Sequence, residues 1–276
     1  MAEADAVPIA LTIAGSDSSG GAGIQADLKT FTVLGVYGAS VVTALTAQNT
    51  RGVTAIHPVP PAFVAQQIDA VAADLKVGAV KTGMLNDRAT VLAVVEGVRR
   101  HGLHPLVVDP VMVATSGDML LMPDAVEAVR AQLLPLADVV TPNLAEAARL
   151  LGTAVAADAA EMETQARALL ALGPKAVLIK GGHGDGAEAL DILVTRDAAP
   201  VHLALPRIAT PNTHGTGCTL SAAIAASLAR GESLATAACA AKSFVHAALV
   251  AGAALKIGDG SGPVDQLFAI REGRKT

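Results

Sequence analysis

The sequence predicts an α/β fold of three layers, in which helices cover both faces of a mostly parallel central sheet. Short apolar runs alternate with longer helical patterns along the chain, as in successive βα units. Hydrophobic residues make up 52% of the 276 residues, with one Tyr, four Phe and no Trp. This aliphatic excess is typical of parallel strands that are buried on both faces.

The expected elements follow one another without a long linker, repeat or low-complexity block. Strands are expected at 8–17, 39–50, 77–85, 105–112, 138–143 and 175–184, and then as a pair at 189–195 and 199–205. Helices are expected at 20–35, 60–75, 87–102, 124–137, 144–152, 158–173, 218–230 and 233–255. We therefore expect one domain over 1–276, with frayed ends at 1–7 and 270–276.

Composition argues against several classes of protein. The net charge of −5 and the lack of a long Lys/Arg cluster disfavour a nucleic-acid binder. No apolar run reaches about 18 residues without a charge, so we expect no membrane span. The N-terminus carries acids and no basic region, and the two cysteines form no CxxC pair. These features favour a reducing, cytoplasmic location.

Polar, glycine-rich segments follow most of the predicted strands. In a parallel sheet such segments meet at the carboxyl edge, where ligands bind. The segments are AGSDSSGGAG, Gln48-Asn49, KTGM, Asp109-Pro110, TPNLAE and KGGHG. Their composition suits a site that handles phosphate, although composition alone does not identify the reaction.

Two nucleotide-binding motifs can be tested directly. The chain has no Gly-Lys dipeptide, which excludes a Walker A loop. Residues 21–26 fit the G-x-G-x-x-A fingerprint of dinucleotide-binding folds, but the acidic residue expected about 20 positions later is missing. Tight backbone packing is the simpler explanation of these glycines, so a dehydrogenase is disfavoured.

The segment NTHGTGCT precedes an apolar helix and suits an anion-binding loop. Gly215 and Gly217 allow the N–H groups of Thr216, Gly217 and Cys218 to point at one position, next to the positive end of the helix. A helix N-terminus lowers the pKa of a thiol, so we expect Cys218 to be partly ionised and to act as a base. The alternative is a small structural cysteine, as we expect for Cys239 in the core.

Other strand-end residues have a functional and a structural interpretation. Asp109 suits a metal or phosphate site, or a turn. Asn143 and Glu146 open a helix, where Glu146 either complements the helix dipole or orients a water on Mg²⁺. Lys180 ends a buried strand and suits an anion contact. The amide of Gln48 can read the donors and acceptors of a flat polar ring.

Together these segments resemble the hydroxymethylpyrimidine/phosphomethylpyrimidine kinases of thiamin biosynthesis, in the ribokinase-like superfamily. The resemblance runs from about Ile9 to Phe268. The segments that carry it are AGSDSSGGAGIQADLKTF, TALTAQNT, KTGML, VVDPVMVATSG, TPNLAEA and NTHGTGCTLSAAIA.

The resemblance implies a fold without a separate β-lid, the cofactors ATP and Mg²⁺, and a homodimer. It implies a pyrimidine site of Gly15, Asp17, Ala22, Gln48, Met84 and Val111. It places the anion hole at Gly215, Thr216, Gly217 and Cys218, with Cys218 as the base. Asp109, Asn143, Lys180 and Lys242 would hold nucleotide or phosphate, and Asp109 and Glu146 the metal. Residues 113–120 would form a flap over the substrate.

The implied reaction phosphorylates the pyrimidine alcohol and then its monophosphate. A pyridoxal kinase of the same superfamily is the main alternative, because pyridoxal is also a flat nitrogen heterocycle with a hydroxymethyl group. One group of such kinases holds the aldehyde with a second cysteine in the flap, and 113–120 contains none. A binding protein that only kept the pocket is the third hypothesis. Intact Asp109, Glu146, Lys180 and Cys218 argue against it.

Overall fold

The computed structural model describes residues 7–113, 117, 120–182 and 186–273. Within them the strands are β1 Ile9–Asp17, β2 Tyr37–Asn49, β3 Gly52–Pro58, β4 Ala79–Thr82, β5 Leu106–Val108, β6 Val139–Val140, β7 Ala176–Lys180, β8 Glu188–Thr195 and β9 Val201–Pro206. The α-helices are α1 Gly23–Val33, α2 Pro61–Asp74, α3 Arg88–His101, α4 Pro123–Ala128, α5 Leu144–Leu151, α6 Ala159–Leu170, α7 Thr216–Ala229, α8 Leu234–Gly252 and α9 Phe268–Gly273.

All the described strands belong to one sheet of order β3-β2-β1-β4-β5-β6-β7-β8-β9. The six strands from β2 to β7 in that order are parallel, whereas β3, β8 and β9 are antiparallel to their neighbours. The prediction of a three-layer, mostly parallel α/β fold is therefore confirmed. The described part of the chain has no second sheet that would form a separate lid.

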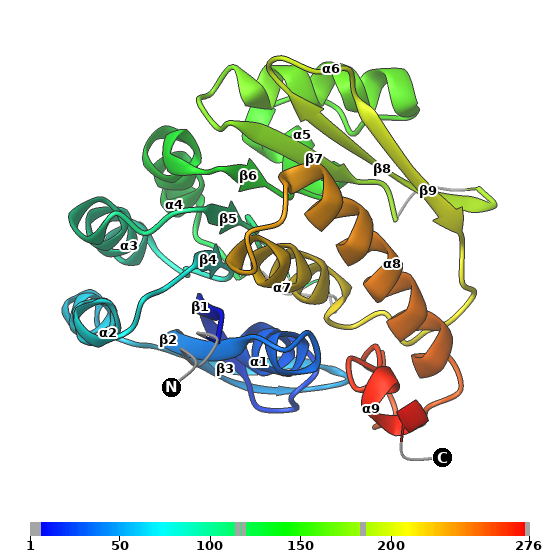
Figure 1. The fold of residues 1–276 in the computed structure, drawn as a ribbon, viewed down its shortest axis with the longest axis horizontal. Helices are drawn as coiled ribbons and strands as arrows, with labels where there is room; N and C mark the ends of the chain where they lie inside the picture. The colour runs from blue at the N-terminus through cyan, green and yellow to red at the C-terminus, as the bar shows by residue number, and fades with distance from the viewer. Residues whose placement is uncertain (1–6, 114–116, 118–119, 183–185, 274–276) are drawn as a thin grey trace, which may run out of the picture.

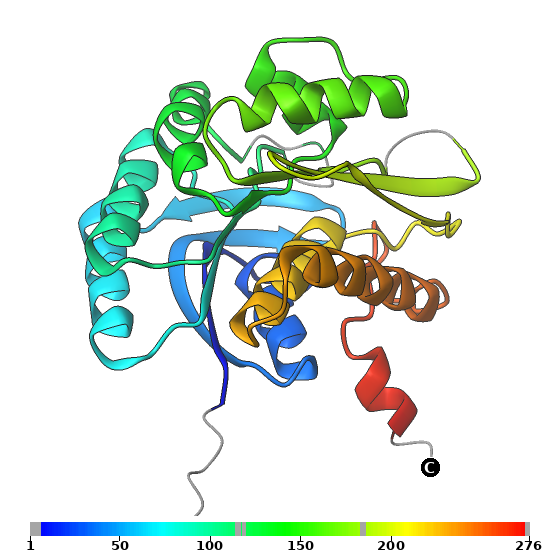
Figure 2. The same ribbon diagram turned by 45° about the horizontal axis from the view of Figure 1, so that its top comes forward.

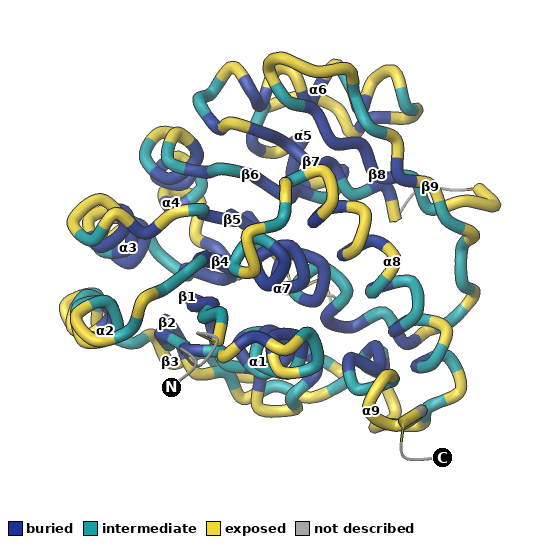
Figure 3. The backbone as a smooth tube through the Cα atoms, viewed as in Figure 1, coloured by how far each residue is buried: buried dark blue, intermediate teal, exposed yellow. Residues whose placement is uncertain are grey.

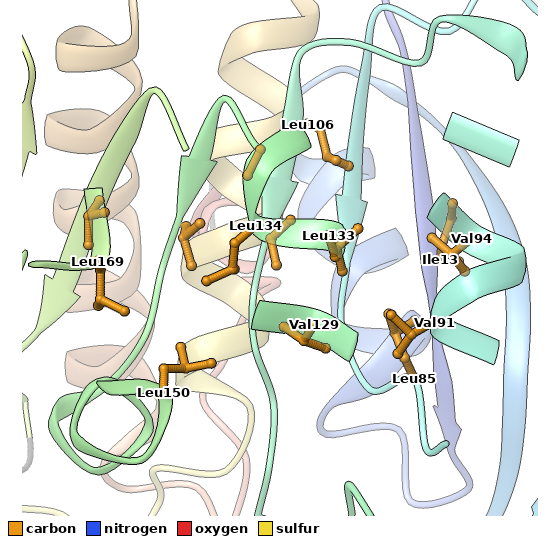
Figure 4. Packing of buried hydrophobic residues seen from close by; sticks show 14 of the residues in the cluster. Ile13, Leu85, Val91, Val94, Leu106, Val129, Leu133, Leu134, Leu150 and Leu169 are labelled. Carbon is orange, nitrogen blue, oxygen red and sulfur yellow. The ribbon is translucent and has the colours of Figure 1, made fainter. Parts of the chain in front are cut away.

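Helices cover both faces of the sheet (Figure 1). Along β1, Leu11 and Ile13 belong to one core cluster and Ala10 to the other, because successive side chains of a strand point to opposite faces. The first cluster packs the sheet against α2 to α6, and Figure 4 shows its aliphatic side chains. The second packs it against α1, α7 and α8, and Figure 2 shows α8 lying beside α7.

Three segments differ from the sequence prediction. β3 was not predicted, because none of its residues is buried and an edge strand of this kind carries no hydrophobic signal. The single helix expected at 124–137 is wound as α4, then the π-helix η1 Val129–Leu133, then the 3₁₀ turn η2 Leu134–Leu136, which contains Pro135. α9 lies partly in the stretch expected to be frayed.

Among the described residues, α8 is the one helix that is long and apolar enough to cross a membrane. Its inner residues Ala237, Ala238 and Ala241 pack into the second core cluster. Figure 3 shows exposed and buried residues alternating along it. Lys242 on this helix forms an ion pair with Asp191 of β8, with Nζ and Oδ2 2.8 Å apart. In this structure α8 is therefore part of the outer helix layer.

Phe31 provides a test of the core beneath α1. It is fully buried, and the change Phe31→Ala is expected to lower the free energy of unfolding by about 3–5 kcal/mol, because it removes buried apolar surface and leaves a cavity. Phe63→Ala is the matched control, since Phe63 is 55% exposed and its loss is expected to change stability by under about 0.5 kcal/mol. Urea unfolding measures both, and equal losses would contradict this packing.

Candidate active site

One cavity of about 840 Å³ opens at the carboxyl edge of the parallel strands. Every residue that the sequence analysis assigned to the site lines it: Gly15, Asp17, Ala22, Gln48, Met84, Asp109, Val111, Asn143, Glu146, Lys180, Gly215, Thr216, Gly217, Cys218 and Lys242. These residues come from the ends of β1, β2, β4, β5 and β7 and from the starts of α1, α5 and α7, except Lys242, which lies within α8. The structure therefore brings the predicted set together, while the role of each residue stays a prediction.

The ends of β1, β2 and β4 form one end of the cavity. A Cβ on Gly15 would lie 3.1 Å from the sulfur of Met84, so these residues are in close contact. The hydroxyl of Thr43 donates to the carbonyl of Met84 over 2.7 Å and fixes that turn. The hydroxyl of Thr46 lies within hydrogen-bond distance of two acceptors, the carbonyl of Ser16 at 2.8 Å and Oε1 of Gln48 at 3.1 Å. Thr46 therefore links the ends of β1 and β2 beside the Gln48 amide.

The carboxylate of Asp17 bonds to groups of the protein around it. It accepts hydrogen bonds from the N–H groups of Gly21 and Ala22 and from the N–H and hydroxyl of Ser19. Nε2 of His214 lies 2.8 Å from Oδ2. Burial acts to raise the pKa of Asp17, but the bonds with His214, Ser19 and Ala22 outweigh it and lower the pKa to about 2. Asp17 thus fixes the loop after β1 and joins it to the loop before α7.

The loop before α7 requires its glycines. Gly215 has a φ of +83°, in the left-handed region, and a Cβ there would lie 2.0 Å from the carbonyl oxygen of Gly21. The N–H of Thr216 donates to the carbonyl of Thr213 over 3.3 Å. The N–H of Thr216 is thus engaged in a long turn bond, and its part in binding an anion stays a prediction. Gly217 and Cys218 remain as donors of the first helical turn.

Cys218 differs from the sequence expectation in its charge. Burial raises the pKa of its thiol to about 11. Lys81 and the backbone N–H of Gly23, which donates to the sulfur, act in the opposite direction without restoring the ordinary value. The expectation of a lowered pKa from the helix N-terminus is therefore wrong for the protein without ligands. The prediction that Cys239 lies in the core is also wrong, since this residue is exposed.

A buried ion pair lies beside this loop. Nζ of Lys180, at the end of β7, lies 2.8 Å from Oδ1 of Asp109, which follows β5. The hydroxyl of Ser221 on α7 donates to Oδ2 of Asp109 over 3.2 Å. A Cβ on Gly217 would lie 3.3 Å from Nζ of Lys180 and 3.7 Å from Oδ2 of Asp109. The start of α7 therefore lies against this pair, and a side chain at residue 217 would crowd the Lys180 ammonium.

Asn143 and Glu146 form a capping box at the start of α5. Oδ1 of Asn143 accepts from the N–H of Glu146, and Oε2 of Glu146 accepts from the N–H of Asn143. The same Oε2 lies 3.9 Å from Nζ of Lys180. Burial raises the pKa of Glu146 to about 7, and the charge of Asp109 adds to the rise, although Lys180 opposes it. Glu146 therefore caps the helix and also lies near Lys180, while its part in a Mg²⁺ site stays a prediction.

Sequence reasoning missed several groups that line or support the cavity. Lys81 is the next-to-last residue of β4, in the segment AVKT, and lines the same cavity as Cys218, with its ammonium paired to Asp27. The signal was available, because Lys180 was singled out for the same position at the end of an apolar strand. Asp191 was also missed, and it engages Lys242 directly. The expected flap at 113–120 lies largely outside the described residues.

The arrangement defines an enzyme that transfers a phosphoryl group. N–H groups at a helix N-terminus, a lysine and two carboxylates converge on one cavity, which can hold phosphate and a divalent cation beside a proton acceptor. The fold places this site at the carboxyl edge of a doubly wound sheet, as in the ribokinase-like kinases.

Comparison with known proteins agrees with this class. The profile of the family described as phosphomethylpyrimidine kinase matches residues 17–265. The hydroxymethylpyrimidine/phosphomethylpyrimidine kinase of Rhizobium meliloti is 61% identical over 256 residues, covering 93% of this chain and 96% of that protein. The chain belongs to the phosphomethylpyrimidine kinase family, and it is a kinase.

Solved structures of two kinds of vitamin kinase share the fold. An ADP complex of the Bacillus subtilis pyridoxal kinase superposes with a TM-score of 0.87 at 37% identity, covering 97% of this chain and all of that one. The phosphomethylpyrimidine kinase of Clostridium difficile gives a TM-score of 0.76 at 44% identity, covering 86% of this chain and 97% of that one. The backbone alone therefore does not separate the two substrate classes.

The raised pKa of Cys218 predicts how fast the thiol reacts. Below a pKa of about 11 the neutral thiol dominates, so alkylation of Cys218 by iodoacetamide is expected to be slow at pH 7–8 and to rise about tenfold per pH unit up to at least pH 10. Mass spectrometry of the alkylated peptides measures this rate, with the exposed Cys239 as an internal reference. A rate for Cys218 that levels off below pH 8 would contradict a neutral thiol at this partly buried position.

Proposed function

We propose that this protein transfers the γ-phosphoryl group of ATP to 4-amino-5-hydroxymethyl-2-methylpyrimidine and then to the resulting monophosphate. The proposal is supported by the family to which the chain belongs and by the names of its relatives. The observation that carries it is the convergence of the Gly215–Cys218 loop, the Asp109–Lys180 pair and the Gln48 end of the cavity in one space. Such a space holds an acceptor ring and a phosphate donor side by side.

The acceptor ring is proposed to lie between Gly15, Ala22, Met84 and Val111, with the Gln48 amide at its polar edge. The amide of Gln48 offers N–H donors to a ring nitrogen and a carbonyl acceptor to an amino group. Asp17 is proposed to act indirectly, by fixing the loop on which Ala22 lies. Binding by a few placed polar groups within an apolar pocket is the usual pattern for a small heterocycle.

The phosphates are proposed to lie between Lys180 and the first turn of α7, close to Asn143. Asp109 and Glu146 fit Mg²⁺, which typically takes one or two carboxylates together with phosphate oxygens and water. The raised pKa of Glu146 supports this, because burial beside Asp109 leaves excess negative charge that a cation relieves. Bound Mg²⁺ would neutralise the charge on the transferred phosphoryl group.

Lys242 is proposed to contribute less directly. Its Nζ is held by Asp191, and the other oxygen of Asp191 accepts from the N–H of Gly181 over 3.0 Å. Contact with phosphate would require the ammonium to share this carboxylate. The Lys242–Asp191 pair is better placed to fix the backbone at Gly181, directly after Lys180 at the end of β7.

Cys218 is proposed to take the proton of the attacking hydroxyl. Only the thiolate can accept this proton, so the thiol must first release its own proton to solvent water. A small thiolate fraction is enough, because phosphoryl transfer depends mainly on alignment and charge stabilisation, and the proton of the hydroxyl leaves late. Cationic groups near the sulfur then decide how readily it ionises. The same groups offset the repulsion that an anionic monophosphate meets in the second step.

Pyridoxal is the alternative acceptor. The TM-score of 0.87 to the Bacillus subtilis pyridoxal kinase, in a chain covered completely, is the observation that favours it. Against it stands the flap segment 113–120, which carries no cysteine to hold the aldehyde. We further propose that the protein is a cytoplasmic homodimer that binds neither nucleic acid nor membrane.

Turnover of three acceptors by the purified protein tests the proposal. ATP consumption with Mg²⁺ is measured with hydroxymethylpyrimidine, its monophosphate and pyridoxal in parallel. Both pyrimidines are expected to turn over, and Cys218→Ala is expected to lower kcat by about 10²-fold or more, as for loss of a general base. Cys239→Ala is the matched control, expected to be unchanged. Turnover of pyridoxal alone would overturn the assignment, and full activity of Cys218→Ala would remove the thiol from the mechanism.

A further inference from the structure

Residues 262–266, called the C-terminal brace below, follow α8 in the chain and lie against the loop that precedes α7. The N–H of His214 donates to the carbonyl of Gly262 over 3.1 Å, and the carbonyl of His214 accepts from the N–H of Val264 over 3.2 Å. These two bonds form a short parallel bridge. The brace therefore holds the residue directly before Gly215 by both polar groups of its backbone.

Gln266 ends the brace and reaches the start of α7. It is buried, with 3% of its surface exposed. Its Nε2 donates to the hydroxyl of Thr219 and to the carbonyl of Gly21, each over 3.3 Å. A carbonyl oxygen can only accept, so the contact with Gly21 identifies the amide nitrogen as the atom that faces both groups. One amide group therefore bridges the first turn of α7 and the loop after β1.

The loop Gly215–Cys218, proposed to bind phosphate, is held at both of its ends. His214 directly precedes this loop and is bonded to the brace, whereas Thr219 directly follows it and is bonded to Gln266. Between these two bonded residues the loop lies so close to Gly21 that a Cβ on its first glycine would be 2.0 Å from the Gly21 carbonyl oxygen. The brace therefore sets how the phosphate end of the cavity lies against the loop after β1.

Gln266 also fixes the peptide unit that joins Gly21 to Ala22. The N–H of Ala22 donates to the Asp17 carboxylate over 2.9 Å, and the carbonyl of Gly21 accepts from Gln266. Both polar groups of this peptide unit are engaged, so its orientation is fixed. Ala22 lines the cavity at the end proposed to hold the acceptor ring. One side chain thus positions a residue of the acceptor end relative to the first turn of α7.

Each of the two loops has other bonds that hold its own shape. Asp17 accepts from N–H groups of the loop after β1, and the N–H of Thr219 donates to the carbonyl of Gly215 over 2.9 Å. Gln266 adds a bond between the loops, at the other end of the phosphate loop from His214 and its contact with Asp17. The spacing between the loops matters most where alignment limits the reaction, because a shift of about 1 Å can lower the rate by about 10²-fold.

We propose that Gln266 is a positioning residue, whose amide holds the acceptor end and the phosphate end of the cavity at the spacing that phosphoryl transfer requires. Gln266 is not among the described residues that line the cavity, so it acts through Gly21 and Thr219. The proposal rests on the proposed function for the identity of the acceptor. The spacing itself would serve any acceptor hydroxyl bound in this cavity.

The test replaces the amide of Gln266 by groups of similar length that differ in their hydrogen-bond donors. Gln266→Met has no donor and is expected to lower kcat for hydroxymethylpyrimidine by about tenfold or more. KM for the pyrimidine and for ATP are each expected to change by less than about twofold, because each end keeps its own bonds. Gln266→His keeps a ring N–H at similar reach and is expected to restore most of kcat. A merely structural role would lower the urea midpoint without this split between kcat and KM.

Asp259→Ala is the matched control in the segment between α8 and α9. Asp259 pairs with Arg51 at the surface, where such pairs contribute little, so kcat is expected to stay near that of the unchanged protein. Thr219→Val removes the hydroxyl that Gln266 contacts and is expected to lower kcat as well. Adding this change to Gln266→Met is expected to cause little further loss, since both changes remove the same bridge.

An unchanged kcat in folded Gln266→Met would overturn the proposal, as would an equal loss of kcat in Asp259→Ala. If Gln266→Met does not fold, Thr219→Val decides, and an unchanged kcat in that variant overturns the proposal. If the unchanged protein phosphorylates pyridoxal and neither pyrimidine, the proposed function fails, and the same comparison with pyridoxal decides the role of Gln266.

Discussion

The ion pair of Asp109 and Lys180 is the interaction on which the rest of the site depends. It joins the ends of β5 and β7, with β6 between them, and it is reached from the opposite side by Ser221 and the glycine loop of α7. Because the pair is buried, each partner needs the other, and loss of one would leave an uncompensated charge. Glu146 and Gly217 both lie next to this pair. Oε2 of Glu146 is 3.9 Å from Nζ of Lys180, and a Cβ on Gly217 would be 3.3 Å from the same atom.

A second constraint is the close approach of three loops. The loop after β1 passes so near to the loop before α7 that neither Gly21 nor Gly215 has room for a side chain. The Asp17–His214 pair fixes this contact, and Nε2 of Gln266 donates to the carbonyl of Gly21 and to the hydroxyl of Thr219. The segment near the C-terminus thus supports the loop proposed to bind phosphate. The loops proposed to hold acceptor and donor are thus tied to one another, which favours a reaction limited by alignment.

Much of this could be predicted from sequence, because periodicity defines the βα order and parallel strands bring their carboxyl ends to one edge. The predictions that failed concerned properties set by contacts between residues far apart in the sequence. The role of Asp17 requires His214, 197 positions later, and the raised pKa of Cys218 comes from burial that its own helix does not reveal. β3 lacks a buried face. Lys81 was overlooked although AVKT and AVLIK carry the same signal.

The most direct test of this account is the affinity of Lys180→Met for each ligand, measured by calorimetry after circular dichroism has confirmed the fold. If Lys180 and its neighbours form the phosphate end of the cavity, the affinity for ATP with Mg²⁺ should fall by about tenfold or more, as for loss of a charge-assisted bond. The affinity for hydroxymethylpyrimidine should stay near that of the unchanged protein. Unchanged binding of ATP, or an equal loss for both ligands, would contradict the arrangement of the two ends.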